Sequence, residues 1–392
     1  MINIFRVSLI ITTAWGVLLL NKGSRFGGFI FLFFLLVLWL CALIRVQIHF
    51  SLLYVFLAAC VLLAIKTKSM ILFYIFFEAS AIPILLIIFI YGYQPEKLHA
   101  TLFLLLYTVI RSLPLLLFIL VSRSSLSMTA RMVSIPMTLA FIVKTPIYLL
   151  HTWLPKAHVE APVGGSMVLA GVLLKLGSYG LLIFLPFIKM NILLSFYYGM
   201  ALLGSIIGSL ICIRIGDIKL LIAYSSVVHI GVVRIGFIRG SELGYVCGLL
   251  MVMGHGLCSP FLFAVAFWLY ENSHSRLFVN LNCAIPLAIS MLMRLVALNI
   301  GVPPRLSLWS EVFISISVLS RKRYLFPSLL LFFFLGISYN LFLYISCRHN
   351  KTPKNIVGIR TQRIYPFIQT VCLSYCSFFV LDIFGLFSDV TT

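Results

Sequence analysis

Residues 141–182 read FIVKTPIYLLHTWLPKAHVEAPVGGSMVLAGVLLKLGSYGLL and combine long apolar runs with internal lysines and prolines. Each of its two apolar segments carries one lysine, Lys144 or Lys175, and the first also contains Pro146 and Pro155. Because lipid offers the backbone no hydrogen-bond partners, so apolar a chain spans the membrane as helices. Proline removes a backbone donor and clashes with the preceding turn, so we expect the first segment to be a discontinuous helix.

The composition of the whole chain points to the same class. Its 392 residues are 62% hydrophobic and 10% charged, whereas a soluble domain is about 25% charged and under about half apolar. This excludes a cytosolic enzyme, a secreted module and a disordered protein. Lys and Arg number 29 against 9 Asp and Glu, an excess that indicates nucleic-acid binding only in a soluble chain, so no nucleic-acid partner is expected. The nine cysteines form no CxxC pair, and no metal is expected.

Hydrophobic segments of spanning length recur along the sequence. Windows of roughly 17–25 mostly apolar residues predict an all-α, polytopic membrane helix bundle of about 13 transmembrane helices. The first segment is interpreted as a spanning helix and not as a cleaved signal. The predicted segments lie at 1–20, 26–44, 49–65, 70–90, 99–121, 132–154, 161–186, 191–213, 218–238, 244–270, 284–320, 325–346 and 364–387.

Two of these segments contain proline breaks, 132–154 and 284–320, the second at Pro303 and Pro304. Each is the fourth in a run of five, which predicts two inverted five-helix repeats, each with a proline-broken helix. Either break alone has a simpler explanation, since proline is common in membrane helices. The predicted parts are N-terminal transmembrane helices at 1–48, five-helix units at 49–186 and 191–346, and a basic loop with a C-terminal transmembrane helix at 347–392.

Ionisable side chains inside the predicted helices are the candidate functional residues, because each costs on the order of 3 kcal/mol to place at the bilayer centre. A row of acid, amine and imidazole groups can relay protons, since each charge changes the favoured ionisation of its neighbours. For a single histidine, an interhelical hydrogen bond is the simpler interpretation, and for the first two groups a static ion pair. The candidates are Glu78, Lys144, Lys175, His229, His255 and Glu311.

The motif at 141–182 closely resembles the signature of the antiporter-like, proton-pumping membrane subunits of respiratory complex I. FFEASAIP at 76–83, GDIKLLIAYSSVVHIGVV at 216–233 and GHGLCSPFLF at 254–263 extend the resemblance over roughly residues 50–345. The resemblance implies a functional carboxylate, a broken-helix lysine, a second lysine, two central-axis histidines and a terminal acid at Glu78, Lys144, Lys175, His229, His255 and Glu311, respectively.

Two further histidines, His151 and His158, flank the first break. The resemblance implies a role for them in the proton path or in the structure of the loop. Capping or ordinary hydrogen bonding is the simpler interpretation for each.

The resemblance also implies a function and a setting. The chain would be a multi-pass protein of the mitochondrial inner membrane that translocates protons through a Glu/Lys/His relay. Electron transfer from NADH to ubiquinone in other subunits would drive it, with NADH, FMN, iron–sulfur clusters and ubiquinone bound by those partners and no cofactor bound by this chain. Its expected partners are other membrane subunits, including the sister antiporter-like chains 2 and 5, and inner-membrane lipid, including cardiolipin. The alternative is a subunit of a multi-subunit cation/proton antiporter of the same family.

Two features depart from the family's pattern. The family usually has one more spanning helix, and the difference falls in the amino-terminal region. Arginines stand at positions 111, 234 and 305, where the family carries small or uncharged residues, and a further arginine stands at 294. Some of them are serines if the organism's mitochondrial code reads certain Arg codons as Ser. Otherwise they are arginines that reach a surface or line wet cavities.

Overall fold

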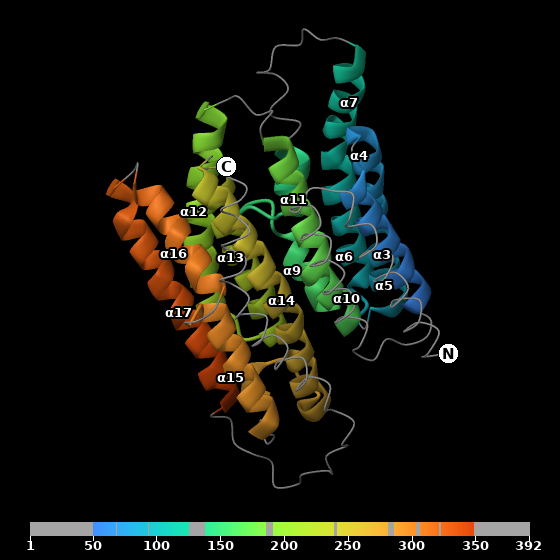
Figure 1. The fold of residues 1–392 in the computed structure, drawn as a ribbon. Helices are drawn as coiled ribbons and strands as arrows, with labels where there is room; N and C mark the ends of the chain where they lie inside the picture. The colour runs from blue at the N-terminus through green and yellow to red at the C-terminus, as the bar shows by residue number, and fades with distance from the viewer. Residues whose placement is uncertain are drawn as a thin grey trace. The chain divides into compact units, whose positions relative to one another are not determined.

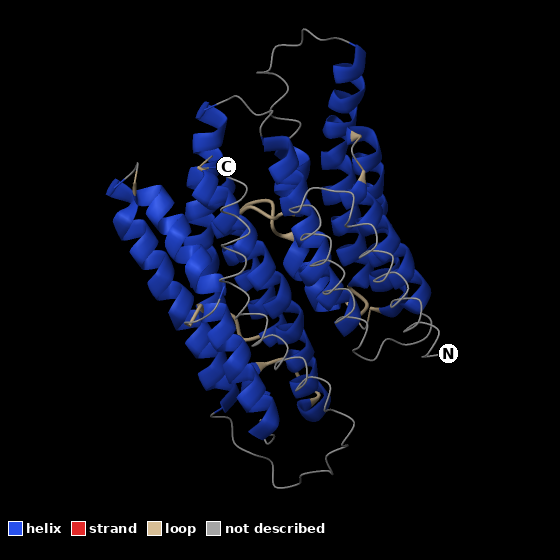
Figure 2. Ribbon diagram, viewed as in Figure 1, coloured by secondary structure: helices blue, strands red, loops and turns tan. Residues whose placement is uncertain are grey.

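The structure is a computed structural model that describes residues 50–67, 69–92, 94–124, 138–185, 191–238, 241–280, 286–302, 306–320 and 323–348. Within these ranges the chain is helical with no strand (Figure 2). Seven of the described helical spans are long and apolar enough to cross a membrane, and three shorter helices are also apolar. The predicted all-α membrane bundle is therefore confirmed. The expectations for 1–48, for Pro303 and Pro304, and for most of 347–392 lie outside the described residues.

The chain divides into two compact units (Figure 1). The first comprises described residues within Met1–Thr145 and Thr152–Met190, the second those within Pro146–His151 and Asn191–Thr392. The short segment after Lys144 thus belongs to the second unit, although it interrupts a helix of the first. Whether the two units are inverted repeats stays a prediction.

Unit 1 is a bundle in which most spans consist of two or three helical pieces. A helix over residues 138–144 precedes the interruption, and two π-helical segments, η1 and η2, lie within longer spans. The pieces are α3 (Phe50–Lys66), α4 (Met70–Ala79), α5 (Ala81–Tyr91), α6 (Lys97–Leu105), η1 (Leu106–Ile110), α7 (Arg111–Ser124), α9 (Trp153–Glu160), α10 (Val163–Val168), η2 (Leu169–Leu173) and α11 (Leu174–Phe184).

Two of these breaks in helical regularity have a proline nearby. Pro114 lies in α7 and has no N–H for the carbonyl of Ile110, which is the last residue of η1. Pro83 lies in the first turn of α5 and leaves the carbonyl of Ala79 without its helical donor. The junction of α4 and α5 is therefore at Ser80, two residues after Glu78.

Unit 2 is built around α13, which packs against α12, α14 and α16. In the apolar 18-residue stretch of each of α13 and α14, 89% of the residues are buried. Polar groups on these two helices are therefore shielded from surrounding lipid. The helices are α12 (Asn191–Arg214), α13 (Ile218–Ile238), α14 (Glu242–Ser273), α15 (Pro286–Ile300), α16 (Leu306–Leu319) and α17 (Phe326–Arg348), with single turns η4 (Phe278–Asn280) and η5 (Arg323–Leu325).

The first predicted interruption lies within the described residues, and at the second α15 ends at Ile300 and α16 begins at Leu306. In unit 1 the helix ends at Lys144, and Pro146 follows two residues later. Within the interruption Leu149 has a φ of 80°, a conformation that an L-residue with a bulky side chain rarely adopts. In unit 2 α15 ends before Gly301, whose φ of 78° is the left-handed conformation that commonly terminates a helix.

One predicted break is wrong. Pro155 does not interrupt a helix but lies in the first turn of α9, which begins at Trp153. The N–H groups of a first turn have no intrahelical acceptor, so a proline there removes no helical hydrogen bond. The discontinuity therefore covers residues 145–152 and involves Pro146 alone of the two prolines.

Candidate functional site

The first cluster of polar groups is an ion pair inside unit 1. The Nζ atom of Lys144 lies 3.0 Å from Oε1 of Glu78 and donates a hydrogen bond of 2.9 Å to the carbonyl of Phe77. It also lies 3.3 Å from the centroid of the Phe77 ring. Lys144 is only 8% exposed, so the carboxylate, the carbonyl and the ring face take the place of bulk water on one side of the ammonium.

The local sequence places both partners. Lys144 is the last residue of the helix over 138–144, where the free carbonyls of the helix end favour a cation. Stacked and tilted rings hold the last turn of α4 against this helix, with Phe77 5.5 Å from both Phe73 and Phe141 between centroids. Phe77 of the FFE motif therefore positions the ion pair as well as filling the core.

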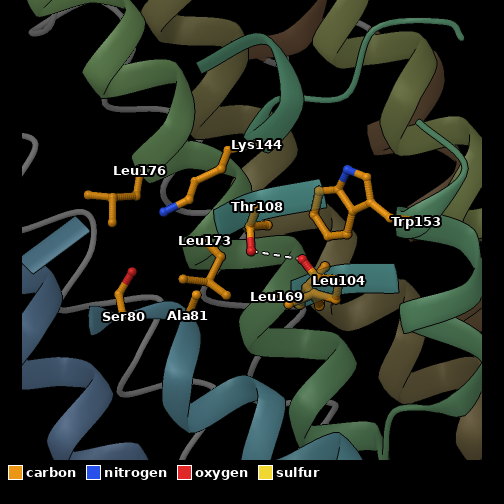
Figure 3. A pocket seen from close by; sticks show the side chains of 9 residues that line it. All are labelled: Ser80, Ala81, Leu104, Thr108, Lys144, Trp153, Leu169, Leu173 and Leu176. Atoms are coloured by element: carbon orange, nitrogen blue, oxygen red, sulfur yellow. Dashed lines mark hydrogen bonds between the residues drawn. The ribbon is translucent and has the colours of Figure 1, made fainter. Parts of the chain in front are cut away.

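A cavity of about 20 Å³ lies beside the ion pair (Figure 3). Its polar lining residues are Ser80, Thr108 and Lys144, and the remainder is Trp153 and apolar side chains. Trp153 donates from Nε1 to the carbonyl of Val143 at 3.1 Å, which ties the start of α9 to the end of the helix that carries Lys144. The two helix ends on either side of the interruption are thus joined directly.

The other predicted groups near the interruption are buried but lie elsewhere. Lys175 is 3% exposed and donates to the carbonyl of Ala170, which lies within η2. His158 is fully buried in α9. His151 belongs to unit 2, where its ring stacks on Tyr148 at 5.1 Å and meets the edge of Tyr224 at 5.6 Å.

The second cluster joins four helices of unit 2. His229 of α13 has its Nδ1 atom 3.5 Å from Oε1 of Glu311 in α16, and its Nε2 atom 3.2 Å from the hydroxyl of Tyr339 in α17. The ring of His255 in α14 lies 5.2 Å from that of His229. All four side chains are at most 7% exposed. The structure thus brings together three of the predicted residues and adds a tyrosine.

The hydrogen-bond roles of His229 follow from its protonation. In the neutral imidazole with Nδ1–H facing the carboxylate, which only accepts, Nε2 accepts from the Tyr339 hydroxyl; in the protonated imidazole Nε2–H donates to that hydroxyl. The position of α17 is held at the same level by Asn340, whose Oδ1 accepts from Nδ2 of Asn299 in α15 at 2.9 Å. Sequence reasoning missed Tyr339 because a tyrosine in an apolar helix carries no charge to mark it.

The intramembrane cations differ in their surroundings. Arg234 is 2% exposed and lies in α13, five residues after His229. Arg111 is half-buried, with its guanidinium 5.3 Å from the ring of Tyr107, and Arg294 is exposed. Lys219 lies in the first turn of α13 and is 7% exposed. Arg305 lies outside the described residues.

Broken helices and buried acid–base groups are features of membrane proteins that move ions or protons, and the described helices have both. A sequence profile described as "NADH:quinone oxidoreductase/Mrp antiporter, TM" matches residues 67–338. The chain belongs to this family of membrane subunits.

Relatives narrow the position within the family. The chain is 38% identical to NADH-ubiquinone oxidoreductase chain 4 of Ceratitis capitata, over 84% of this chain and 76% of the relative. It is 39% identical to chain 4 of Artemia franciscana, over 74% of this chain and 78% of the relative. The motifs of the sequence also resemble chain 4 of the mitochondrial enzyme more than its sister chains 2 and 5, and these relatives confirm that prediction.

Solved structures show the fold. A chain of respiratory complex I from Thermus thermophilus with bound NADH superposes with a TM-score of 0.83 at 24% identity, covering 90% of this chain and 80% of that one. A chain of the Mrp complex from Dietzia sp. DQ12-45-1b gives 0.78 at 14% identity, covering 98% and 89%.

Proposed function

We propose that the chain is the chain 4 subunit of a mitochondrial NADH:ubiquinone oxidoreductase and translocates protons across the inner membrane. The observation that carries this is the buried pair of Lys144 and Glu78, whose charged atoms are 3.0 Å apart. A static pair of this kind is not a favourable way to stabilise a core, since apolar residues of similar volume often do as well or better. A pair retained inside a membrane helix bundle is better explained by a function that moves charge.

The pair itself supplies a switch. While Glu78 stays beside Lys144, the carboxylate and the ammonium keep each other charged. If the interrupted helix moves so that the contact opens, burial favours the neutral amine, and Lys144 releases its proton. The interruption after Lys144 provides the place where such a movement can occur, because residues 145–152 have no helical hydrogen-bond ladder to break.

The remaining candidates receive and pass on the proton in this proposal. Lys175 is the next buried amine of unit 1. In unit 2, His229 lies between an acceptor, Glu311, and a hydroxyl donor, Tyr339, while His255 packs beside it. Each of these groups can hold a proton and lose it again, which an arginine does not do at accessible pH.

Electron transfer belongs to partner subunits in this proposal. They would bind NADH, FMN, iron–sulfur clusters and ubiquinone, and this chain would bind none of them. Its neighbours would be other membrane subunits, including the sister chains 2 and 5, with cardiolipin among the surrounding lipids. Within the described residues no three His, Cys, Asp or Glu side chains are grouped as a metal site.

A second candidate is a subunit of a cation/proton antiporter, which the family profile and the similarity to an Mrp complex chain favour. It would use the same residues without redox partners. Purification of the chain from native membranes separates the two. Co-purification with NADH:ubiquinone reductase activity supports the first, and a complex that exchanges cations for protons without that activity supports the second.

The proton-pumping role is tested in assembled complexes returned to vesicles. We expect Lys144→Ala to abolish the proton pumping that depends on this chain. A larger fraction of the native NADH oxidation than of the native pumping should remain, because the switch is lost but the electron carriers are untouched. The matched control is Lys156→Ala, which removes an exposed lysine of α9 that lies 3.8 Å from the Phe103 ring centroid. A normal ratio of protons to electrons in Lys144→Ala would overturn the role of Lys144.

A further inference from the structure

The cavity beside Lys144 has the size of a single water molecule. Its volume is about 20 Å³, and on this measure a water needs about 10–15 Å³ together with two to four polar partners. Lys144, Ser80 and Thr108 are the polar lining residues. Figure 3 shows the amine of Lys144 and the hydroxyl of Ser80 turned toward each other, with Thr108 between them and Trp153.

The hydroxyl groups of Ser80 and Thr108 can only accept hydrogen bonds from a molecule in the cavity. Ser80 donates its hydroxyl proton to the carbonyl of Phe77 at 2.7 Å, and Thr108 donates its own to the carbonyl of Leu104 at 2.8 Å. A hydroxyl has a single donor proton and two lone pairs. Both oxygens therefore present only acceptor capacity to the cavity, while the ammonium of Lys144 presents only donors.

The backbone around the cavity is irregular on two sides. Thr108 lies within the π-helical segment η1, and Leu169 and Leu173, the first and last residues of η2, are also lining residues. Single π-helical turns are rare and occur frequently at functional sites. The described π segments of unit 1, η1 and η2, thus border the same small cavity.

We propose that this cavity binds one water molecule that exchanges a proton with Lys144, and that Ser80 and Thr108 are its positioning residues. The inference rests on the proposed proton translocation. The water donates its two hydrogens to the two hydroxyl oxygens and turns its own oxygen toward the ammonium. In the exchange an N–H bond of Lys144 breaks and an O–H bond forms on the water. In the reverse step one O–H bond of the resulting hydronium breaks and the N–H bond of Lys144 forms again, which restores both the ammonium and the water.

The test compares three threonine variants in the assembled complex, with NADH-driven proton pumping measured per assembled complex. Thr108→Val keeps the shape but removes the acceptor, and we expect pumping to fall about fivefold, the equivalent of one ordinary hydrogen bond. Thr108→Ser restores the hydroxyl and should stay within about twofold of the native rate. The matched control is Thr101→Val, because Thr101 makes the same kind of bond, to Leu98 at 2.8 Å, outside the cavity lining.

Three results would overturn the inference. The first is an unchanged rate in Thr108→Val, and the second is an equal loss in Thr108→Ser, which would make the effect one of packing. The third is a map of the native complex that resolves buried waters elsewhere but has no density in this cavity. If Lys144→Ala abolishes pumping while Thr108→Val does not change it, the water site is wrong and the proposed function stands. If neither variant changes pumping, the proposed function fails.

Discussion

The two buried clusters both hold ionisable side chains inside a helix bundle, but they do so with different chemical groups. In unit 1 an amine faces a carboxylate at 3.0 Å with a backbone carbonyl at 2.9 Å. In unit 2 an imidazole lies 3.5 Å from a carboxylate and 3.2 Å from a hydroxyl. The first depends on two charges that each need the other, whereas an imidazole can donate a hydrogen bond to its carboxylate in the neutral form as well as in the charged form. Unit 1 is thus suited to a switch with two distinct states, and unit 2 to repeated proton loading.

The cavities beside the two clusters differ in volume and in polar lining. The one at Lys144 measures about 20 Å³ and has three polar lining residues. The one at Glu311 measures about 10 Å³, and its other polar lining residues are Ser205 and Ser315. The smaller volume lies at the lower limit for one water. The cavity beside Lys144 therefore has more room for a water molecule than the cavity beside Glu311.

The largest expected effect tests the difference in charge directly. Glu78→Met leaves the ammonium of Lys144 buried without its carboxylate, and we expect a loss of about 3–5 kcal/mol in stability. Replacing both residues, Glu78→Met with Lys144→Met, should recover most of that loss but no pumping. The matching change in unit 2, Glu311→Met, should cost only about 1–3 kcal/mol, because His229 can stay neutral. Thermal unfolding and the yield of assembled complex measure these effects.

Two outcomes would contradict this comparison. A double methionine variant as unstable as Glu78→Met would show that packing, and not the unpaired charge, is responsible. A loss for Glu311→Met as large as that for Glu78→Met would show that the histidine cluster also carries an obligatory charge. Either would remove the distinction between the two units.

A smaller effect is expected at Tyr339. Tyr339→Phe keeps the ring but removes the donor to Nε2 of His229, so we expect proton pumping to fall about fivefold with little change in assembly. The control is Tyr344→Phe, a half-buried position on the same helix. Because Tyr339 acts through His229, Tyr339→Phe should have little further effect when added to His229→Gln. Independent, multiplied losses in the double variant would show that Tyr339 does not act by positioning the imidazole.

The last prediction concerns mass and not activity. Arg234 is 2% exposed within a membrane helix, where an arginine costs on the order of 3 kcal/mol, and lies one residue past a helical turn from His229. We therefore expect peptide mass spectrometry of the native chain to find serine at position 234. Arg111 lies on the ring of Tyr107 and is half-buried, so it has the surroundings of a true arginine. Detection of arginine at 234 would exclude the codon explanation there and place a fixed charge in unit 2.

Ionisable side chains in apolar segments, together with a proline, made most residues of the site predictable from the sequence. Glu78, Lys144, His229 and Glu311 stand out because an ionisable group is conspicuous in an apolar helix, and the structure groups them two by two. The location of the first interruption followed from Pro146. These signals are local, and each is visible in a single short stretch of sequence.

The missed features depend on contacts between distant segments. Tyr339 meets His229 across 110 residues of chain, and the carbonyl of Phe77 is a ligand of Lys144 that no side-chain type reveals. Pro155 was misjudged because a proline in a first turn looks the same in sequence as one that breaks a helix.

The π segment η2 has a consequence for how the helix around it faces. An α-helix turns by about 100° per residue, so the extra residue held in Leu169–Leu173 rotates all that follows by roughly that angle relative to what precedes. Lys175 comes two residues after this point. Deletion of one residue here would leave the helix continuous but turn the amine toward a different neighbour. If an alignment of two related chains has a one-residue gap at this place, the side chain equivalent to Lys175 therefore points in a different direction in the two proteins.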